Sequence, residues 1–324
     1  MNRRIGFGLA LAVALAAPFI GYPVFLMKLL CFGLFACAFN LLIGFTGLLS
    51  FGHAAFFGAA GYVAGYLLLE KGVPFELGIL GAVAGSALVG LVMGALAIRR
   101  AGIYFSMITL ALAQMVHFVA LRASSITHGE DGLQGVPRGK LLGMVDLSND
   151  LTMYYVVLAI AIAGFALIMR TVHSPFGQVL KAIKENEPRA ISLGYDVDKY
   201  KLVAFVLSAA LAGLAGATKT VVLGFETLTD VHWSMSGLVI LMTLVGGMGT
   251  LVGPILGAFI IIAIENKLGD FGTFLTAQTG IEWFTSIGES VGMVTGLIFI
   301  TCVLLFRRGI VGELGAWMAR KKPA

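Results

Sequence analysis

Charged side chains are scarce throughout this chain of 324 residues. Asp, Glu, Lys and Arg make up 12% of it, against about 25% in soluble domains. Hydrophobic residues account for 59%, and the mean hydropathy is +0.96. A surface exposed to water cannot be built with so little charge. The composition therefore excludes a soluble protein and predicts a polytopic membrane protein surrounded mainly by the lipid bilayer.

Nothing in the charge or the cysteines points to nucleic acid or to metal. The formal net charge of +5 comes from basic residues that cluster at the ends of apolar runs, where they set the orientation of a membrane protein. Cysteine is rare, and the three residues lie inside apolar runs at no metal-like spacing. We interpret them as small buried hydrophobes: Cys31, Cys37 and Cys302.

Enzyme motifs are missing as well. The sequence has no HExxH, no GxSxG and no histidines at metal-ligand spacing. Residues 213–220 come close to a phosphate-binding loop, but Thr218 stands where that motif requires glycine. Residues 247–253 come close to a dinucleotide fingerprint, but they are one residue too long and lack a βαβ context. We therefore expect neither catalysis nor a bound cofactor or metal in this chain.

Apolar runs dominate the sequence, and a membrane-spanning helix needs about 20 such residues. We identify ten candidate spans, at 5–21, 24–43, 48–69, 75–98, 103–121, 151–169, 202–223, 234–247, 251–268 and 287–306. The predicted fold is an all-α membrane protein, a bundle of about ten transmembrane helices in a single domain, 1–324. The eighth and ninth runs are short and separated by glycines, so they fit separate helices or a re-entrant pair.

An even number of spans places both termini on the same side of the membrane. Basic residues are concentrated in the loop 170–201 and after the last span. The positive-inside rule therefore puts that loop and both termini in the cytoplasm. The loops 122–150 and 266–286 then lie outside. The basic, apolar N-terminus resembles a signal peptide, but further spans follow at once, and we expect it to be retained as the first span.

Acidic side chains are nearly absent from the predicted spans. Glu226 and Glu265 fall at span ends, and Asp230 falls in a short loop. Transporters driven by protons or sodium usually embed a carboxylate in the membrane. We therefore expect the energy for transport to come from elsewhere.

Uncharged polar side chains do occur within the spans. They could bond neighbouring helices together or line a path for a small polar solute, and the sequence leaves both open. The histidines His53 and His117 likewise fit a hydrogen-bonded packing role or a place in the pathway. The candidate translocation path consists of Asn40, Thr46, Ser50, His53, Thr109 and Gln114.

A charged segment between two apolar runs, 174–194, must lie in water. Ser174 and Pro175 predict a helix start, and Pro188 predicts a second one. Gly194 is a typical helix end. We expect two short helices that expose aliphatic side chains among charges, either docking a soluble partner or lying on the membrane surface.

Ten residues of this segment resemble the cytoplasmic coupling loop of ABC importer permeases: Ser174, Pro175, Gly177, Ala182, Ile183, Glu185, Asn186, Glu187, Ala190 and Gly194. The chain resembles in particular the M-type (LivM-like) permease family of branched-chain amino acid transporters. Blocks of the same family follow in order at 40–56, 127–133, 200–205, 212–216 and 246–254. Pro188 and Arg189 depart from the general importer pattern but are similar to this family's variant. His128 stands where we expect a small residue.

The resemblance implies one permease subunit of an ABC importer in the bacterial inner membrane. Its partners would be a second, LivH-like permease, two LivG/LivF-like ATPases that bind ATP and Mg²⁺, and a periplasmic substrate-binding protein. The coupling loop, 174–200, would transmit ATPase motion to the spans, and this chain would hydrolyse nothing.

The resemblance suggests branched-chain amino acids as the solute, while members of the family carry other amino acids, urea or short amides, or aromatic acids. A hypothesis of another class is an ATP-independent channel or secondary transporter, with 174–194 lying on the membrane. An intramembrane enzyme using His53 or His117 would lack a paired nucleophile or acid.

Overall fold

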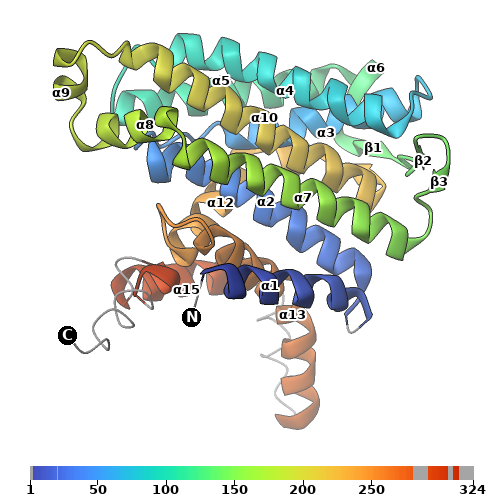
Figure 1. Cartoon of the computed structure of the whole chain (residues 1–324). Coiled ribbons are helices and arrows are strands. Elements are labelled where there is room, and N and C mark those ends of the chain that lie inside the picture. The colour runs from blue at the N-terminus through green and yellow to red at the C-terminus, as the bar shows by residue number, and fades with distance from the viewer. Residues whose placement is uncertain (1–2, 20, 280–290, 306–308, 314–324) are drawn as a thin grey trace.

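The computed structural model describes residues 3–19, 21–279, 291–305 and 309–313, and most of them are helical. Five described helices are long and apolar enough to cross a membrane. They run alongside one another (Figure 1): α2 (Pro23–Phe45), α4 (Phe75–Ala97), α5 (Ile103–Arg122), α7 (Asp150–His173) and α10 (Val197–Leu223). The helical fold class is confirmed by these elements.

The other five predicted spans also contain helices, but these are shorter or less apolar. They are α1 (Arg3–Ala16), α3 (His53–Leu69), α12 (Trp233–Gly246), α13 (Gly253–Thr279) and α15 (Val291–Leu305). The number of ten crossings therefore stays a prediction. So does the orientation, because the basic residues at 307–308 and 320–322 lie outside the described residues.

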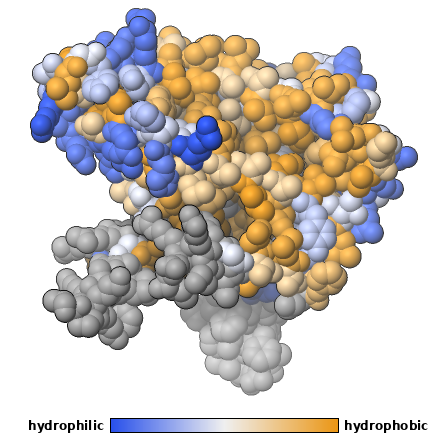
Figure 2. All heavy atoms as spheres, viewed as in Figure 1, coloured by the Kyte–Doolittle hydropathy of each residue, from blue (hydrophilic) through white to orange (hydrophobic). Residues whose placement is uncertain are grey.

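The bundle has a polar segment at each end. One end carries α8 (Pro175–Glu185) and α9 (Glu187–Ser192), and we call it the α8–α9 end. The opposite, strand end carries the elements of the 122–150 loop: α6 (Ser124–Thr127), η2 (Gly129–Asp131), β1 (Leu133–Gln134), β2 (Lys140–Leu141) and β3 (Val145–Asp146). Figure 2 shows hydrophilic residues at these two ends and a mainly hydrophobic surface between them, as expected for a protein that spans a bilayer.

Short strands close the strand end. β1 pairs antiparallel with β4 (Phe225–Glu226), which follows α10, and β2 pairs with β3. A short helix, α11 (Leu228–Val231), comes next and leads to α12. These two-residue strands were not predicted, and the β1–β4 pair fixes the segment after α10 against the 122–150 loop.

Helix α10 packs against α2, α3 and α4. Small residues allow the close approach: a Cβ atom at Gly216 would collide with the carbonyl oxygen of Phe57 in α3. Close packing of this kind drives helix association in lipid, where the hydrophobic effect between helices is weak. Large buried side chains fill the surrounding core, among them Phe35, Phe39, Phe56 and Phe205.

Helices α12 and α13 form a tight antiparallel hairpin. A Cβ at Gly246 would collide with the carbonyl oxygen of Gly253, and a Cβ at Gly257 would collide with that of Met242. The eighth and ninth predicted spans are therefore two helices joined by a short turn, and both predicted forms, two separate spans or a re-entrant pair, agree with this hairpin. With 14 residues, α12 is about 21 Å long, which is short of the hydrocarbon thickness of about 30 Å.

Several helix boundaries differ from the prediction. The third span was predicted to begin at residue 48, but α3 begins at His53, and residues 47–52 are not helical. Helix α10 begins five residues before the predicted 202 because Asp196 caps it, accepting a hydrogen bond from the Lys199 N–H at 3.3 Å. The outer loop predicted at 266–286 was wrong for residues 266–279, which belong to α13; residues 280–286 lie outside the described part.

Candidate functional site

The segment 174–200 folds as the two short helices that its capping residues predict. The Ser174 hydroxyl accepts a hydrogen bond from the Gly177 N–H at 3.3 Å, so Ser174 caps α8. The Asn186 side chain accepts one from the Arg189 N–H at 3.1 Å and caps α9. Gly194 has a φ of +87°, the left-handed conformation that glycine adopts at low cost. The local sequence therefore positions both helices.

The apolar residues of this segment divide into an inner and an outer set. Ile183 and Ala190 are buried and pack with Val197 in a small core of their own. Exposed aliphatic side chains were expected on both helices, and this was wrong for Ile183 and Ala190, which are buried in the core that α8 and α9 form with α10. Ile191 and Leu193 are 57% and 68% exposed, so they form an apolar patch that water or a partner must cover.

Three side-chain contacts anchor α8 and α9 to the bundle. The Lys184 ammonium donates a hydrogen bond to the carbonyl oxygen of Gly44, in the last turn of α2, at 2.6 Å. Lys201 Nζ of α10 lies 2.5 Å from Glu187 Oε1 of α9, with the Lys201 side chain only 6% exposed. The Phe176 and Tyr200 rings stack at 5.5 Å. A movement of α8 and α9 would therefore pull on both α2 and α10.

Four of the six candidate path residues support the non-helical segment 47–52 and the turn beside it. Asn40 bridges α2 to the α12–α13 turn, donating to the Thr250 carbonyl at 2.8 Å and accepting from the Gly249 N–H at 2.9 Å. Thr109 of α5 accepts from the Phe51 N–H at 3.2 Å. Ser50 accepts from the Gly52 N–H, and Thr46 donates to the Leu41 carbonyl. These bonds satisfy backbone groups that lipid cannot.

His53, the first residue of α3, is buried in an aromatic cage. Its ring makes edge contacts with Phe39, Phe56 and Phe205, and its Nε2 lies 2.9 Å from the Ser208 hydroxyl. Ser208 donates its only proton to the Ala38 carbonyl at 2.6 Å. His53 Nε2 must therefore be the donor to Ser208, which makes this a packing contact between α3 and α10.

Gln114, the last of the six candidate path residues, and the second candidate histidine, His117, lie apart from segment 47–52. Gln114 of α5 is half-buried, and its Nε2 has no hydrogen-bond partner among the described residues. His117 is also half-buried and lies one turn further along α5, with its ring 5.3 Å from that of His232. The structure thus brings Asn40, Thr46, Ser50 and Thr109 together around 47–52 and leaves Gln114 outside.

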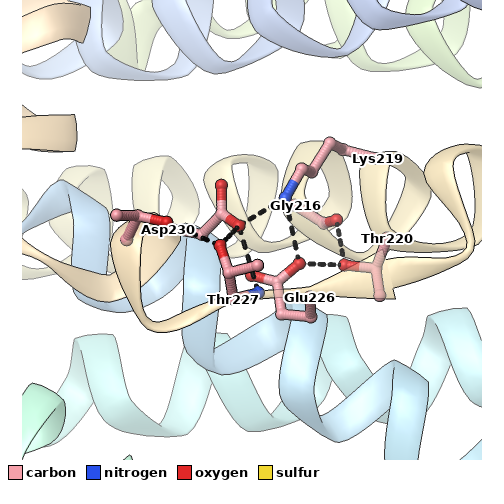
Figure 3. Close-up of polar contacts among 7 residues, drawn as sticks. Gly216, Lys219, Thr220, Glu226, Thr227 and Asp230 are labelled. Carbon is pink, nitrogen blue, oxygen red and sulfur yellow. Dashed lines mark hydrogen bonds and ion pairs between the residues drawn. The ribbon is translucent and has the colours of Figure 1, made fainter. Parts of the chain in front are cut away.

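A buried ionic cluster, formed by Lys219, Glu226 and Asp230 at the strand end, was missed by the sequence analysis (Figure 3). Lys219 Nζ lies 2.5 Å from Asp230 Oδ2 and 3.3 Å from Glu226 Oε2. Side-chain exposure is 4% for Lys219, 0% for Glu226 and 8% for Asp230. A lysine inside a predicted span was the available signal, because such a charge is costly unless it is paired.

Comparison with known proteins gives consistent results. The family profile described as "Branched-chain amino acid transport system / permease component" matches residues 23–303. The LivM high-affinity branched-chain amino acid permease protein of Escherichia coli K12 is 27% identical over 265 residues, 74% of this chain and 62% of the relative. LivM of Salmonella typhimurium is 26% identical over 297 residues, 83% of this chain and 69% of the relative.

Another similar protein has a name that specifies a different solute. LsrC of Klebsiella pneumoniae, an autoinducer 2 import system permease protein, is 28% identical over 215 residues, 65% of this chain and 59% of the relative. Among solved structures, a chain of PsaBC from Streptococcus pneumoniae in complex with Fab has a TM-score of 0.40 and 18% identity, covering 87% of this chain and 91% of that one.

The match to E. coli LivM spans 62% of that protein's length. Because the profile covers most of the sequence, the chain belongs to the family of permease components of branched-chain amino acid transport systems.

Proposed function

We propose that this chain is a permease subunit of an ABC importer in the bacterial inner membrane, with both termini in the cytoplasm. It would pair with a second, LivH-like permease, two LivG/LivF-like ATPases and a periplasmic substrate-binding protein. ATP and Mg²⁺ would bind to the ATPases, so this chain would perform no catalysis. The observation that carries the proposal is the α8–α9 segment, which exposes Ile191 and Leu193 while being tied to α2 and α10.

The contacts of that segment suggest how ATPase motion would reach the bundle. An ATPase that grips Ile191 and Leu193 would move α8 and α9 together, because their shared core holds them as one body. Lys184 would pass the motion to the end of α2. The non-helical residues 47–52 follow directly, and irregular backbone at membrane depth is typical of transporter substrate pathways. Alternating access would thus begin at this segment.

The six path residues keep a role in this proposal, although most would act indirectly. Asn40, Thr46, Ser50 and Thr109 are bonded to backbone groups, so they would shape the path by fixing its backbone. We propose branched-chain amino acids, or another small polar solute such as other amino acids, urea or amides, or aromatic acids. One relative is named for autoinducer 2 import, so membership of the family is compatible with more than one solute.

Purification in a gentle detergent from native membranes tests this function. We expect two ATPases and a second permease to co-purify, and we expect Ile191→Glu to lose the ATPases while the second permease stays. The matched control is Met144→Glu in the 122–150 loop, an apolar side chain that is 88% exposed and lies at the opposite, strand end of the bundle. Recovery of the chain alone, under conditions that keep another ABC importer intact, would contradict the importer proposal.

One observation favours the alternative, an ATP-independent channel or secondary transporter. The carboxylates of Glu226 and Asp230, expected at a span end and in a loop, are buried beside Lys219. Buried carboxylates are common in transporters driven by ion gradients. Uptake into proteoliposomes without ATP would support this alternative, whereas a strict requirement for ATP and the partner subunits would support the importer.

A further inference from the structure

The buried ionic cluster does not balance its own charge. It contains one ammonium, from Lys219, and two carboxylates, from Glu226 and Asp230, and none of the three side chains is more than 8% exposed. Half-buried Lys28 of α2 interacts electrostatically with the cluster and with Glu265 of α13. Counting these two as well gives two cations and three carboxylates. The cluster is therefore one positive charge short whether or not these neighbours are included, and burying such an excess charge is costly.

The hydrogen bonds show where the imbalance lies. Asp230 Oδ2 is well satisfied, because it receives the Lys219 ammonium and accepts from the Thr227 hydroxyl at 2.8 Å and the Thr227 N–H at 3.3 Å. Glu226 Oε2 accepts from Thr220 at 2.5 Å and faces Lys219 at 3.3 Å (Figure 3). Glu226 Oε1 is buried and has no hydrogen-bond partner among the described residues.

A bare carboxylate oxygen in such a place is unfavourable. A proton on it removes the negative charge, and a neutral O–H without a partner costs less to bury than a charged oxygen without one. Burial raises the pKa of Glu226 to about 8, against the opposing attraction of the Lys219 ammonium. Two further titratable groups interact electrostatically with the cluster. The Tyr62 hydroxyl of α3 is likewise buried without a hydrogen-bond partner among the described residues, and the buried Cys31 thiol of α2 interacts with Lys219.

Glu226 also lies where the segment after α10 packs against α3. Its carboxyl occupies the space that a side chain at Gly61 of α3 would fill, and Val231 occupies the space beside Gly58. Its backbone pairs with Leu133 in β1. The segment Phe225–Val231 thus fits onto a glycine face of α3 and joins the two loops of the strand end. A negative charge on Glu226 would weaken this fit.

We propose that Glu226 is a proton-binding site, which carries a proton on Oε1 at neutral pH and thereby keeps Phe225–Val231 seated on α3. The proton comes from water and returns to water when the segment loosens. Under the proposed import function this would stabilise the strand end, although the proton site itself does not require that function.

Infrared spectroscopy of the full chain in lipid tests the assignment. We expect the carbonyl band of a buried, protonated carboxyl at neutral pH, lost in Glu226→Gln and lost in the wild type as the pH rises through about 8. Labelling the wild type with isotope-labelled glutamate should shift the band, which assigns it to a glutamate and not to Asp230, and its loss in Glu226→Gln then identifies the residue. Absence of the band at neutral pH, or a band that disappears only in Asp230→Asn, would overturn the proposal.

Thermal unfolding in detergent gives a second measurement. A carboxyl whose pKa rises from 4.5 to about 8 on folding stabilises the protein below pH 4.5 and loses that contribution as the pH rises to about 8. The midpoint should therefore fall over this range more steeply in the wild type than in Glu226→Gln. Parallel curves would refute the proton site. Neither measurement involves uptake or partner subunits. A result that refutes the proton site would therefore leave the import proposal untouched.

Discussion

Replacing Lys184 with methionine tests whether α8 acts on the bundle through the end of α2. The variant keeps the length of the side chain but removes the ammonium that donates to the Gly44 carbonyl at 2.6 Å. Hydrogen bonds from charged donors contribute about 1.5–3 kcal/mol when shielded. Lys184 is largely exposed, so we expect about 1 kcal/mol here, in line with a cation at a helix C-terminus.

The effect on transport depends on how this bond differs between the states of the cycle. If the bond forms in only one of them, losing about 1 kcal/mol shifts the balance about fivefold, since 1.4 kcal/mol is about tenfold. We therefore expect solute imported per ATP hydrolysed to fall about fivefold in the reconstituted complex, with ATP hydrolysis retained. Lys184→Arg should recover most of the coupling because it keeps a cationic donor.

The control is Lys199→Met, which removes the same charge from the same segment. Lys199 has an 81% exposed side chain and pairs with Asp196 at 2.7 Å, and exposed pairs contribute little. Its uptake should match the wild type. Equal coupling ratios for Lys184→Met and Lys199→Met would refute the role of the Gly44 contact, and loss of the ATPases from the Lys184 variant would show a defect in docking instead.

Further substitutions test the anchors and the packing. Glu187→Gln should destabilise the detergent-purified chain by about 1–3 kcal/mol, measured by denaturant unfolding, because it leaves Lys201 buried without its ion pair; unchanged stability would contradict this. Gly194→Ala should cost about 1 kcal/mol in the same assay, since φ is +87°, and Gly194→Asn should cost less. Gly246→Ala should lower the yield of folded protein because its Cβ collides with the neighbouring helix, whereas Gly237→Ala in the same helix has open space and should not.

The apolar helices could be predicted from the sequence because hydropathy over a long run is a strong, local signal. α2, α4 and α5 begin and end within two residues of the predicted spans. The errors fall where hydropathy does not determine the backbone conformation. Residues 48–52 continue the apolar run, but hydrogen bonds to side chains of α5 hold their backbone in a non-helical conformation. The start of α10 is set by the Asp196 cap.

The coupling segment could be predicted in its local structure but not in its contacts. Ser174, Asn186 and Gly194 act within three or four residues of themselves, so capping rules suffice. The bond from Lys184 to Gly44 joins residues 140 positions apart, and no periodicity or spacing reveals it. The exposed or buried state of Ala190 likewise depends on the core formed with Val197, which lies in the next helix.

Strained or buried charged positions were the least predictable. His128, placed where we expected a small residue, has a φ of +59°, a conformation that side chains other than glycine adopt at some cost. The ionic cluster was missed for a different reason. Lys219 and its acidic partners are separated by the end of α10, and they meet only because the chain turns back over α3 after Gly224.

The positions of the two ion pairs on α10 connect both ends of the molecule. Lys201 pairs with Glu187 at the α8–α9 end, and Lys219 pairs with Asp230 at the strand end, where it also contacts Glu226. The 18 residues from 201 to 219 correspond to about 27 Å of helix, close to the thickness of the hydrocarbon core. A helix held by ion pairs at both ends transmits displacement along its axis, because bending it would break backbone hydrogen bonds that lipid cannot replace. In the proposed importer, motion of α9 would therefore reach the segment Phe225–Val231 directly, and the proton on Glu226 would determine how firmly that segment resists it.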